Sequence, residues 1–401
     1  MRILEQNYNR LSVLKAIRRF GPVARTDLPA RTGLSGGLIT QLTAELLENG
    51  LIRERKDMQQ RPGRPRVNLE INASGAVVIG ASRNLDGTVG VSFIDLAGDL
   101  IFSCDVPLRH DRTLTGLAHA IALAIGEAIT TSPFEQSGIR HVGLAMHAVV
   151  DRDHGVVLHI TTLPPGPVPF AQIISRELGI AVTIENDVSC MARAEHWFGR
   201  ARQMDSFTLI NFDLALGSAR YRDGLLITGV NGISAEIGHT KLYTGAEARP
   251  CYCGAKGCAG TYASIFGVLR AAGLGTFEGA PDTDAFLRSF DGLVEQAYAG
   301  DAAALSLLHQ AGEMLGVITA NHINASDPGN VLILLPNPQF ADLITEHFDD
   351  ALVANVMPGM LHNNHVTTAF ADPDWRWKGT AALALEHTYL SPGRVSEDLA
   401  K

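Results

Sequence analysis

Apolar positions in the first fifty residues recur at the spacing of helices. The first apolar face consists of Leu4, Leu11, Leu14 and Ile17, and Gly21-Pro22 follows it. A second short helix is expected from near Thr26 to Gly33, and Ser35 is a good N-cap for a third. The third apolar face consists of Leu38, Ile39, Leu42, Leu46 and Leu47, which Asn49-Gly50 ends. Two helices joined by a tight glycine turn are typical of a helix-turn-helix.

Strand-like alternation follows these helices. Residues 51–54 and 67–71 alternate apolar and polar side chains, and Arg61-Pro62-Gly63-Arg64-Pro65 lies between them. The pattern predicts a winged helix-turn-helix DNA-binding domain over residues 1–75.

The third helix of that fold enters the major groove of DNA, so its exposed side chains would face base edges and backbone. The candidate DNA-binding residues of this helix are Ser35, Gly36, Gly37, Thr40, Gln41 and Thr43. In the segment between the strands, Arg61 and Arg64 would reach into a minor groove. A stiff surface linker explains the same two arginines equally well.

From residue 77 the pattern changes to strands that alternate with helices. Apolar runs predict strands at 77–80, 89–95, 100–102, 142–146, 182–184, 207–210 and 331–335. Helices are expected at 114–131, 301–325 and 338–352. This order indicates an α/β architecture and is compatible with two similar halves around a cleft.

Composition narrows the class of protein. At 401 residues, with 46% hydrophobic and 19% charged residues, the chain is a globular protein and not a disordered adaptor. Its first residues lack the apolar core of a signal peptide, and no run approaches the ~18 apolar residues that span a bilayer. Five cysteines, of which three are clustered, fit a reducing compartment. We therefore expect a cytoplasmic protein with no membrane partner.

Charge is distributed unevenly along the chain. Residues 1–75 contain 13 Lys and Arg against 7 Asp and Glu, whereas the remainder contains 20 against 35. A basic N-terminal module on an acidic body favours binding of nucleic acid by the module alone, because the body would repel phosphates. A locally basic, solvated face is the alternative interpretation.

Three cysteines and a histidine have the spacing of a metal site. His239 precedes Cys251, Cys253 and Cys258, and Gly254 and Gly257 permit the loop to fold back. Three thiolates and one imidazole satisfy a tetrahedral Zn²⁺, and with every ligand from the protein such a site would be closed and structural. The alternative is that small buried cysteines and a turn histidine merely lie near one another.

Four sequence features together resemble the ROK family, named for repressors, open reading frames and kinases. They are Glu185-Asn186-Asp187 after a strand, Glu236-Ile237-Gly238-His239, the cysteine cluster, and Asp327-Pro328 before a strand. The resemblance implies a two-lobed, actin-like body of the sugar-kinase, ribonuclease H-like type. It implies a small lobe at 76–188 plus about 376–395 and a large lobe with the zinc loop at 189–375. With the winged helix-turn-helix in front, the chain is similar to the transcriptional-regulator branch.

The resemblance also implies roles for individual residues. In the family's kinases the aspartate that matches Asp187 is the general base, and the residues that match Asn186, Glu236 and His239 hold sugar hydroxyls. Carboxylates and amides at strand ends suit that task, because they form hydrogen bonds to vicinal hydroxyls. A helix cap is the structural alternative for Asn186 and Asp187, and both roles are compatible.

The phosphate-binding parts depart from the kinase pattern in three places. Residues 82–88 lack paired glycines, Asp213-Leu214-Ala215-Leu216-Gly217 replaces a glycine-rich loop, and Leu334-Leu335-Pro336 replaces a glycine pair. Backbone amides cradle phosphate only where glycines permit close approach, so we expect that ATP is not bound.

The residues expected to bind the sugar depart less from the family's pattern than the phosphate-binding parts do. Gly260 stands where the family has a glutamate, Ala235 replaces a glycine, and His147-Ala148 replaces Pro-Gly. His147 then becomes a candidate effector contact, and we expect an effector bulkier than an unmodified hexose.

The sequence thus predicts a non-enzymatic transcriptional regulator, most simply a repressor of carbohydrate-metabolism genes. Expected partners are double-stranded operator DNA, a carbohydrate-related effector, and further copies of the chain in a homodimer or homotetramer. One rival is an ATP-dependent sugar kinase with an accessory N-terminal domain, which Asp187 supports. Another is a DNA-binding protein that has lost its ligand, which Gly260 and Ala235 support.

Overall fold

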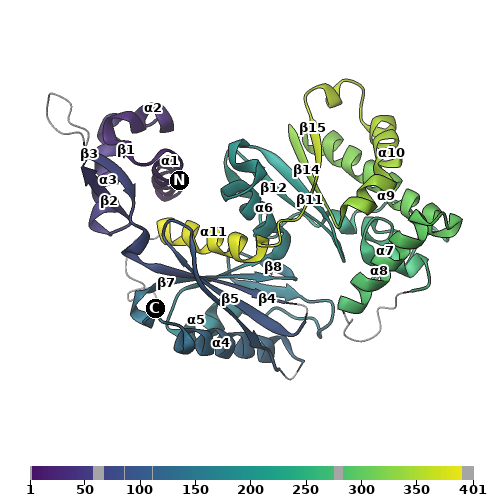
Figure 1. Cartoon of the computed structure of the whole chain (residues 1–401), viewed down its shortest axis with the longest axis horizontal. Helices are drawn as coiled ribbons and strands as arrows, with labels where there is room; N and C mark the ends of the chain where they lie inside the picture. Colours follow the sequence, from purple (N-terminus) through teal and green to yellow (C-terminus); the bar gives the residue numbers. More distant parts are fainter. Residues whose placement is uncertain (1, 57–66, 85, 111, 275–282, 391–401) are drawn as a thin grey trace.

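The computed structural model describes residues 2–56, 67–84, 86–110, 112–274 and 283–390. Its N-terminal module contains three helices and a three-stranded antiparallel sheet of order β1-β3-β2 (Figure 1). The helices are α1 (Arg2–Phe20), α2 (Leu28–Thr32) and α3 (Gly36–Glu48), and the strands are β1 (Val23–Ala24), β2 (Ile52–Lys56) and β3 (Val67–Ile71). Gly33 ends α2 with φ 72°, and the Ser35 hydroxyl accepts the Leu38 amide at the start of α3. The three helices and both longer strands lie where the sequence predicts them, whereas β1 was not expected.

Two five-stranded mixed sheets form the body and share one topology. The first has the order β10-β7-β4-β5-β6 and the second β13-β12-β11-β14-β15. In each sheet an antiparallel meander of three strands is extended by two parallel strands. The first comprises β4 (Val77–Arg83), β5 (Thr88–Asp95), β6 (Leu100–Pro107), β7 (Ile139–Met146) and β10 (Val182–Asn186). The second comprises β11 (Phe207–Phe212), β12 (Leu216–Arg222), β13 (Leu225–Ile227), β14 (Asn330–Leu335) and β15 (His365–Phe370).

Helices cover both faces of each sheet (Figure 1). On the first sheet, α4 (Leu114–Thr131) and α5 (Phe170–Leu178) lie on one face and α11 (Trp375–Leu390) on the other. On the second sheet, α6 (Asp187–Trp197) packs on one face, and a group of four helices packs on the other. These four are α7 (Ile265–Ala271), α8 (Thr283–Tyr298), α9 (Ala302–Ser326) and α10 (Pro338–Asn355). A short hairpin, β8 (Val149–Asp151) and β9 (Val156–His159), follows β7.

The C-terminal helix α11 joins the two lobes through close backbone contacts. A Cβ on Gly143 of β7 would lie 2.6 Å from the carbonyl oxygen of Thr380. A Cβ on Gly379 would lie 2.2 Å from the carbonyl oxygen of Cys190 in α6. Glycine is therefore required at both positions, because any side chain would push α11 away from β7 or from α6.

One described helix, α4, is long and apolar enough by length and composition to cross a membrane. The sequence expectation that no run approaches that length is therefore wrong. Half of the helix is buried inside the protein, where Leu117, Ile121 and Ile125 pack against the first sheet. Burial of this apolar face against a sheet is the behaviour of a core helix.

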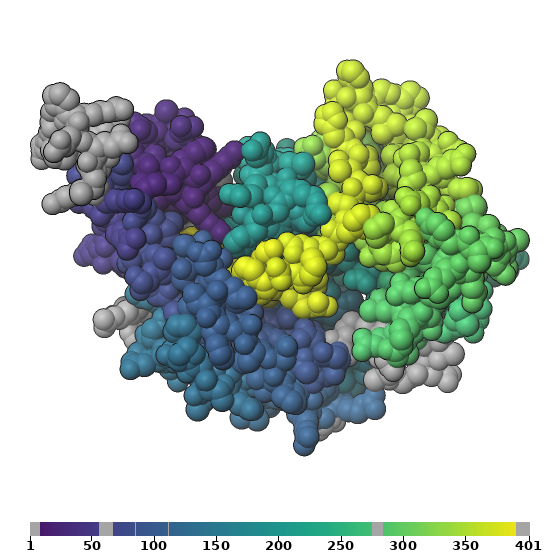
Figure 2. All heavy atoms as spheres, in the orientation of Figure 1, coloured from purple at the N-terminus to yellow at the C-terminus, as the bar shows by residue number. Residues whose placement is uncertain are grey.

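The N-terminal module packs against the body through a shared hydrophobic core. Leu14 and Ile17 of α1 belong to the same buried cluster as Leu96, Trp197 and Leu385. Figure 2 shows the purple module touching the teal segment that carries the β12–β13 turn, where Lys15 Nζ donates to the Gly224 carbonyl at 3.0 Å. The helix α1 therefore contacts the first sheet, α11 and the second sheet at once.

Candidate functional site

A polar cleft lies between the two lobes, where β4, β7 and β10 end and the β11–β12 turn faces them. It is lined by the predicted effector residues His147, Asn186, Asp187 and His239. Arg83 and Arg376 also line it, and neither was singled out from the sequence. Ligands of α/β proteins bind at the carboxyl ends of parallel strands, which is where this cleft opens.

Asn186 is already engaged as the N-cap of α6. Its Oδ1 accepts the amides of Val188 at 2.9 Å and Ser189 at 3.3 Å, and its Nδ2 donates to the Ala148 carbonyl at 3.1 Å. The cap role considered from the sequence is therefore confirmed. Asn186 also fixes the turn that presents His147 to the cleft.

Asp187 forms an ion pair that the sequence did not predict. Its Oδ2 lies 2.7 Å from His147 Nδ1, and its Oδ1 accepts the Val188 amide at 3.0 Å. The Asp187 carboxylate raises the pKa of His147 above the usual value. Asp187 therefore already has a hydrogen-bond partner in His147, which a hydroxyl that binds in the cleft would have to share or displace.

Glu236 does not line the described cleft, although it lies near it. The residue is exposed in the loop before the 3₁₀ turn Ile237–His239. Protein atoms around the carboxylate desolvate it in part although the residue reaches solvent, and this desolvation, followed by repulsion from the Asp187 carboxylate, raises the pKa of Glu236 above the usual value. The structure therefore brings Asn186, Asp187, His147 and His239 to one cleft and places Glu236 at its margin.

The β11–β12 turn, on the opposite wall, uses its own backbone groups internally. The Leu214 amide donates to Asp213 Oδ1 at 2.8 Å, and the Asp213 amide donates to the Ala215 carbonyl at 3.3 Å. The Asp213 side chain is exposed toward the cleft, which places a negative charge where a phosphate would have to lie. These amides are not arranged as a phosphate cradle.

A second cavity of about 190 Å³ adjoins the cleft and shares Ala215, Leu216 and Tyr252 with it. Gly260 lines this second cavity. A Cβ on Gly260 would lie 3.3 Å from the Gly238 carbonyl oxygen and 3.9 Å from both Gly238 Cα and Leu216 Cβ. The missing carboxylate therefore leaves space directly beside the cleft.

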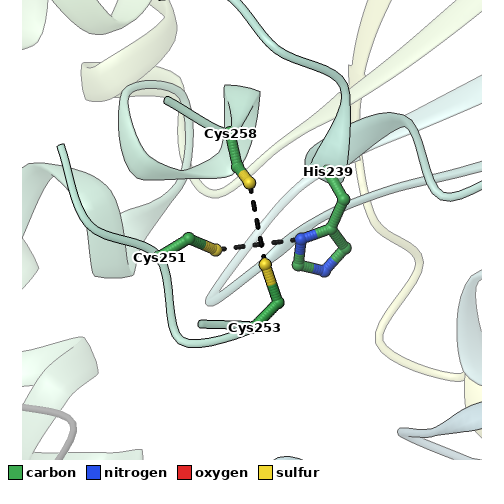
Figure 3. A group of neighbouring side chains, drawn as sticks. All are labelled: His239, Cys251, Cys253 and Cys258. Atoms are coloured by element: carbon green, nitrogen blue, oxygen red, sulfur yellow. Dashed lines mark hydrogen bonds between the residues drawn. The ribbon is translucent and has the colours of Figure 1, made fainter. Parts of the chain in front are cut away.

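The predicted metal ligands converge on one point. The ligand atoms of His239, Cys251, Cys253 and Cys258 all lie within 4.8 Å of one another. Figure 3 shows the three sulfurs and His239 Nδ1 directed toward a common centre. Cys251 Sγ lies 3.8 Å from His239 Nδ1, and Cys253 Sγ lies 3.7 Å from Cys258 Sγ. The arrangement is consistent with a metal site, because a single ion at the centre could be reached by all four donors.

Two neighbours of this cluster were missed in the sequence. The Tyr252 hydroxyl lies 3.1 Å from His239 Nε2, which leaves Nδ1 to face the sulfurs. Burial lowers the pKa of His239, which favours the neutral imidazole that binds metals. Lys241 Nζ donates to Cys258 Sγ at 2.7 Å and balances thiolate charge. Residues 241 and 252 carry no spacing signal, so only the folded loop reveals them.

The predicted DNA-reading face of α3 needs one correction. Ser35, Gly36, Gly37, Thr40 and Gln41 are exposed, as expected. Thr43 is fully buried, and its hydroxyl donates to the Ile39 carbonyl at 2.8 Å. The expectation that Thr43 faces DNA is therefore wrong, because this position of α3 lies in the buried interior of the module. Arg61 and Arg64 lie outside the described residues.

Comparison with known proteins gives the family. A model described as "ROK family" matches residues 98–375, more than half of the chain. The chain belongs to the ROK family. This ROK protein is 23% identical over 354 residues to the "Xylose repressor" of Caldicellulosiruptor bescii. The alignment covers 87% of this chain and 88% of the relative.

Solved structures distinguish two branches of the family. A ROK family transcriptional regulator, a homolog of the Escherichia coli MLC protein, aligns with a TM-score of 0.78 at 22% identity and covers 97% of both chains. A ROK family glucokinase from Streptomyces griseus aligns with a TM-score of 0.60 at 22% identity and covers 77% of this chain and 99% of its own. The alignment with the regulator therefore covers the N-terminal module as well as the body, whereas the alignment with the glucokinase covers 77% of this chain.

Proposed function

We propose that this ROK protein is a repressor of carbohydrate-metabolism genes, controlled by a sugar or sugar derivative. The observation that carries the proposal is the Asp187–His147 ion pair, 2.7 Å long, in a cleft that retains its polar lining. The pair keeps hydroxyl-binding groups in place while it occupies the base needed for phosphoryl transfer. Binding without turnover is what a regulatory site requires.

The N-terminal module would bind double-stranded operator DNA through α3. Thr40 and Gln41 offer hydrogen-bonding side chains on its exposed face, and Gly36 and Gly37 permit close approach to the backbone. Ala44 is exposed on the same face and would contact a thymine methyl. In the proposal, Arg61 and Arg64 enter an adjacent minor groove.

The effector would bind to Asn186, Asp187, Glu236, His239 and His147. Glu236 lies at the cleft margin, so it would reach a sugar only when the lobes approach each other. A ligand that binds the closed arrangement better than the open one shifts the population toward closure. We take residues 76–188 with about 376–395 and residues 189–375 as the two units that move.

The helix α6 offers a route from the cleft to the DNA-binding module. It begins with the Asn186 cap in the cleft and ends at Trp197, whose ring lies 4.6 Å from the Arg18 guanidinium of α1. Glu386 of α11 accepts from Arg193 Nε at 2.9 Å and from Trp197 Nε1 at 2.8 Å. Closure would therefore move α6 and α11 together and tilt α1, which also holds the second lobe through Lys15.

Zn²⁺ is the metal that best suits the cluster, because one imidazole and three thiolates form a closed tetrahedral site. Its proposed role is structural: the bound ion would fix the loop that carries Glu236 and His239. Paired DNA-binding modules would come from a homodimer or homotetramer, so that two recognition helices meet half-sites about 34 Å apart.

Fluorescence anisotropy with labelled fragments of the DNA upstream of the gene tests the DNA-binding half of this proposal. We expect sequence-preferring binding that weakens steeply with salt, since only the basic module meets phosphates. Gln41→Ala should cost roughly 1–3 kcal/mol and relax the sequence preference. Ser132→Ala, on the far side of the body, is the control. Equal affinity of the wild type for all fragments would contradict the proposal.

A further inference from the structure

Arg83 is a cation in the cleft for which the described residues provide no anionic partner. It is the last residue of β4 and lines the cleft together with His147 and Arg376. Its Nε is buried and has no hydrogen-bond partner. No carboxylate of residues 2–56, 67–84, 86–110, 112–274 and 283–390 lies within ion-pair distance of its guanidinium, whereas Arg152 of the same lobe and Arg193 of α6 are both paired.

Such a group is costly unless something completes its environment. A guanidinium is always charged and has five donors, and removing a charge from water without a partner is unfavourable. Burial lowers the pKa of Arg83, which reflects the same penalty. Ionisable groups whose pKa values are perturbed by desolvation cluster at functional sites, and Arg83 is half-buried in a cleft with its Nε unpartnered.

The other charges around the cleft leave an excess of positive charge on this wall. The carboxylate of Asp187 is matched by His147 at 2.7 Å. Arg376, at the start of α11, lies 5.0 Å above the Trp375 ring rather than beside an acid. Two further acids lie away from this wall: Asp213 on the opposite wall, where it would repel an anion, and Glu236 at the cleft margin.

We propose that the effector carries an anionic group, a carboxylate or a phosphate, that pairs with the Arg83 guanidinium. Its hydroxyl-bearing part then lies toward Asn186, Asp187 and Glu236. Arginine suits this role because its planar fork matches carboxylate and phosphate oxygens in a bidentate manner. The inference rests on the proposed function, since it names the chemical class of ligand for the same cleft.

Calorimetric titration of the full chain with matched sugars tests this inference. The probes are glucose, glucuronate and glucose 6-phosphate, N-acetylglucosamine and its 6-phosphate, and xylose with xylonate. We expect at least one acid or phosphate to bind about tenfold or more tightly than its neutral parent. The two kinds of acid distinguish carboxylate from phosphate as the bound group.

The variant Arg83→Gln should abolish that preference and change the affinity for neutral sugars less than twofold. Arg83→Lys, which keeps the charge but not the planar fork, should retain part of the preference. Arg176→Gln, an exposed arginine on α5 at the outer face of the first sheet, controls for net charge. Without ligand, Arg83→Gln should melt at the same or a higher temperature, because it removes an unpaired buried charge.

The opposite results would contradict either the anion inference or the proposed function. If neutral and anionic sugars bind equally, or if Arg83→Gln keeps the preference, the anion inference is wrong and the proposed function stands. If the protein binds operator DNA but no sugar of either kind, the effector half of the proposed function is wrong as well. A lower melting temperature for Arg83→Gln would show that Arg83 serves the fold, which also overturns the inference.

Discussion

The two walls of the cleft have kept different parts of what a sugar kinase needs. On the β10–α6 wall, Asn186 and Asp187 remain at the strand end in good hydrogen-bonding geometry. On the β11–β12 wall, Asp213 lines the cleft, and the amides of Asp213 and Leu214 are hydrogen-bonded within the turn. In the proposed function the first wall recognises hydroxyls, whereas the second wall does not serve as a phosphate cradle.

The difference shows how one fold separates recognition from chemistry. Hydroxyl recognition needs only a few oriented side chains, and the strand end and the α6 N-terminus fix those with little else. Phosphoryl transfer also needs electrostatic stabilisation of the phosphoryl group and a correctly placed nucleophile. Here His147 lies 2.7 Å from the Asp187 carboxylate. Function therefore has to be inferred from the site and not from the fold.

The largest expected effect is the absence of phosphoryl transfer. A coupled assay with Mg-ATP and the sugars named above should give no turnover, because both the cradle and the free base are missing. The related double variant His147→Gly, Asp213→Gly should remain inactive, since Leu334-Leu335-Pro336 still lacks the glycine pair expected of a kinase. Turnover of the wild type at a typical kinase rate, about 1–100 s⁻¹, would contradict the contrast between the walls.

The metal site should have the next largest effect. Metal analysis should find about one zinc ion per chain, with a binding free energy of about 10–16 kcal/mol as in small zinc sites. Cys258→Ser should lose the ion and displace the loop of Glu236 and His239, so that sugar binding fails. Cys104→Ser, a free cysteine outside the cluster, is the matched control. Full zinc content in Cys258→Ser would rule out the proposed ligand set.

Glu236 tests whether the hydroxyl-binding part of the cleft includes a residue from its margin. Glu236→Gln should weaken sugar binding by roughly 1–3 kcal/mol, because it removes a charged acceptor of a hydroxyl hydrogen bond. Stability should hardly change, since Glu236 is exposed. Asp223→Asn, an exposed acid in the β12–β13 turn, is the control for calorimetry. Unchanged affinity in Glu236→Gln would show that the lobes do not close onto the ligand.

The smallest expected effect concerns the link from cleft to module. Arg18 lies 4.6 Å from both the Trp197 and the Phe198 rings, and such contacts contribute roughly 0.5–2 kcal/mol. Arg18→Met should reduce the ratio of operator affinities measured with and without effector, while sugar binding is kept. Arg19→Met, on the neighbouring position, should leave the ratio unchanged. An equal loss in both variants would mean that Arg18 is not part of the link.

Local sequence patterns predicted most of the helices and strands named above, but they did not predict contacts between residues far apart in the sequence. Gly33 and Ser35 predict where α2 ends and α3 begins, because helix caps and turns depend on residues adjacent in the sequence. Thr43 could not be assigned, because only the packing of α3 against the other two helices decides which side is buried. The strand β1 has two residues, too few for any alternation to be recognised.

In the candidate site, too, local features were predicted from the sequence and long-range contacts were not. The metal ligands were predicted because three of them lie within eight residues, from Cys251 to Cys258. The pairing of His147 with Asp187 spans 40 residues, and the unpaired state of Arg83 depends on the whole cleft. Both follow from the order of strands in the first sheet, which the sequence pattern alone does not fix.

Effector-dependent operator binding tests the central claim most directly. Anisotropy of a labelled operator would be measured for the wild type and for Glu236→Ala, with the tightest-binding sugar from the calorimetric panel. If the sugar controls DNA binding, it should change the operator affinity of the wild type by about fivefold or more and leave the operator affinity of Glu236→Ala unchanged. A wild-type affinity that does not respond to a sugar bound in the cleft would contradict that claim.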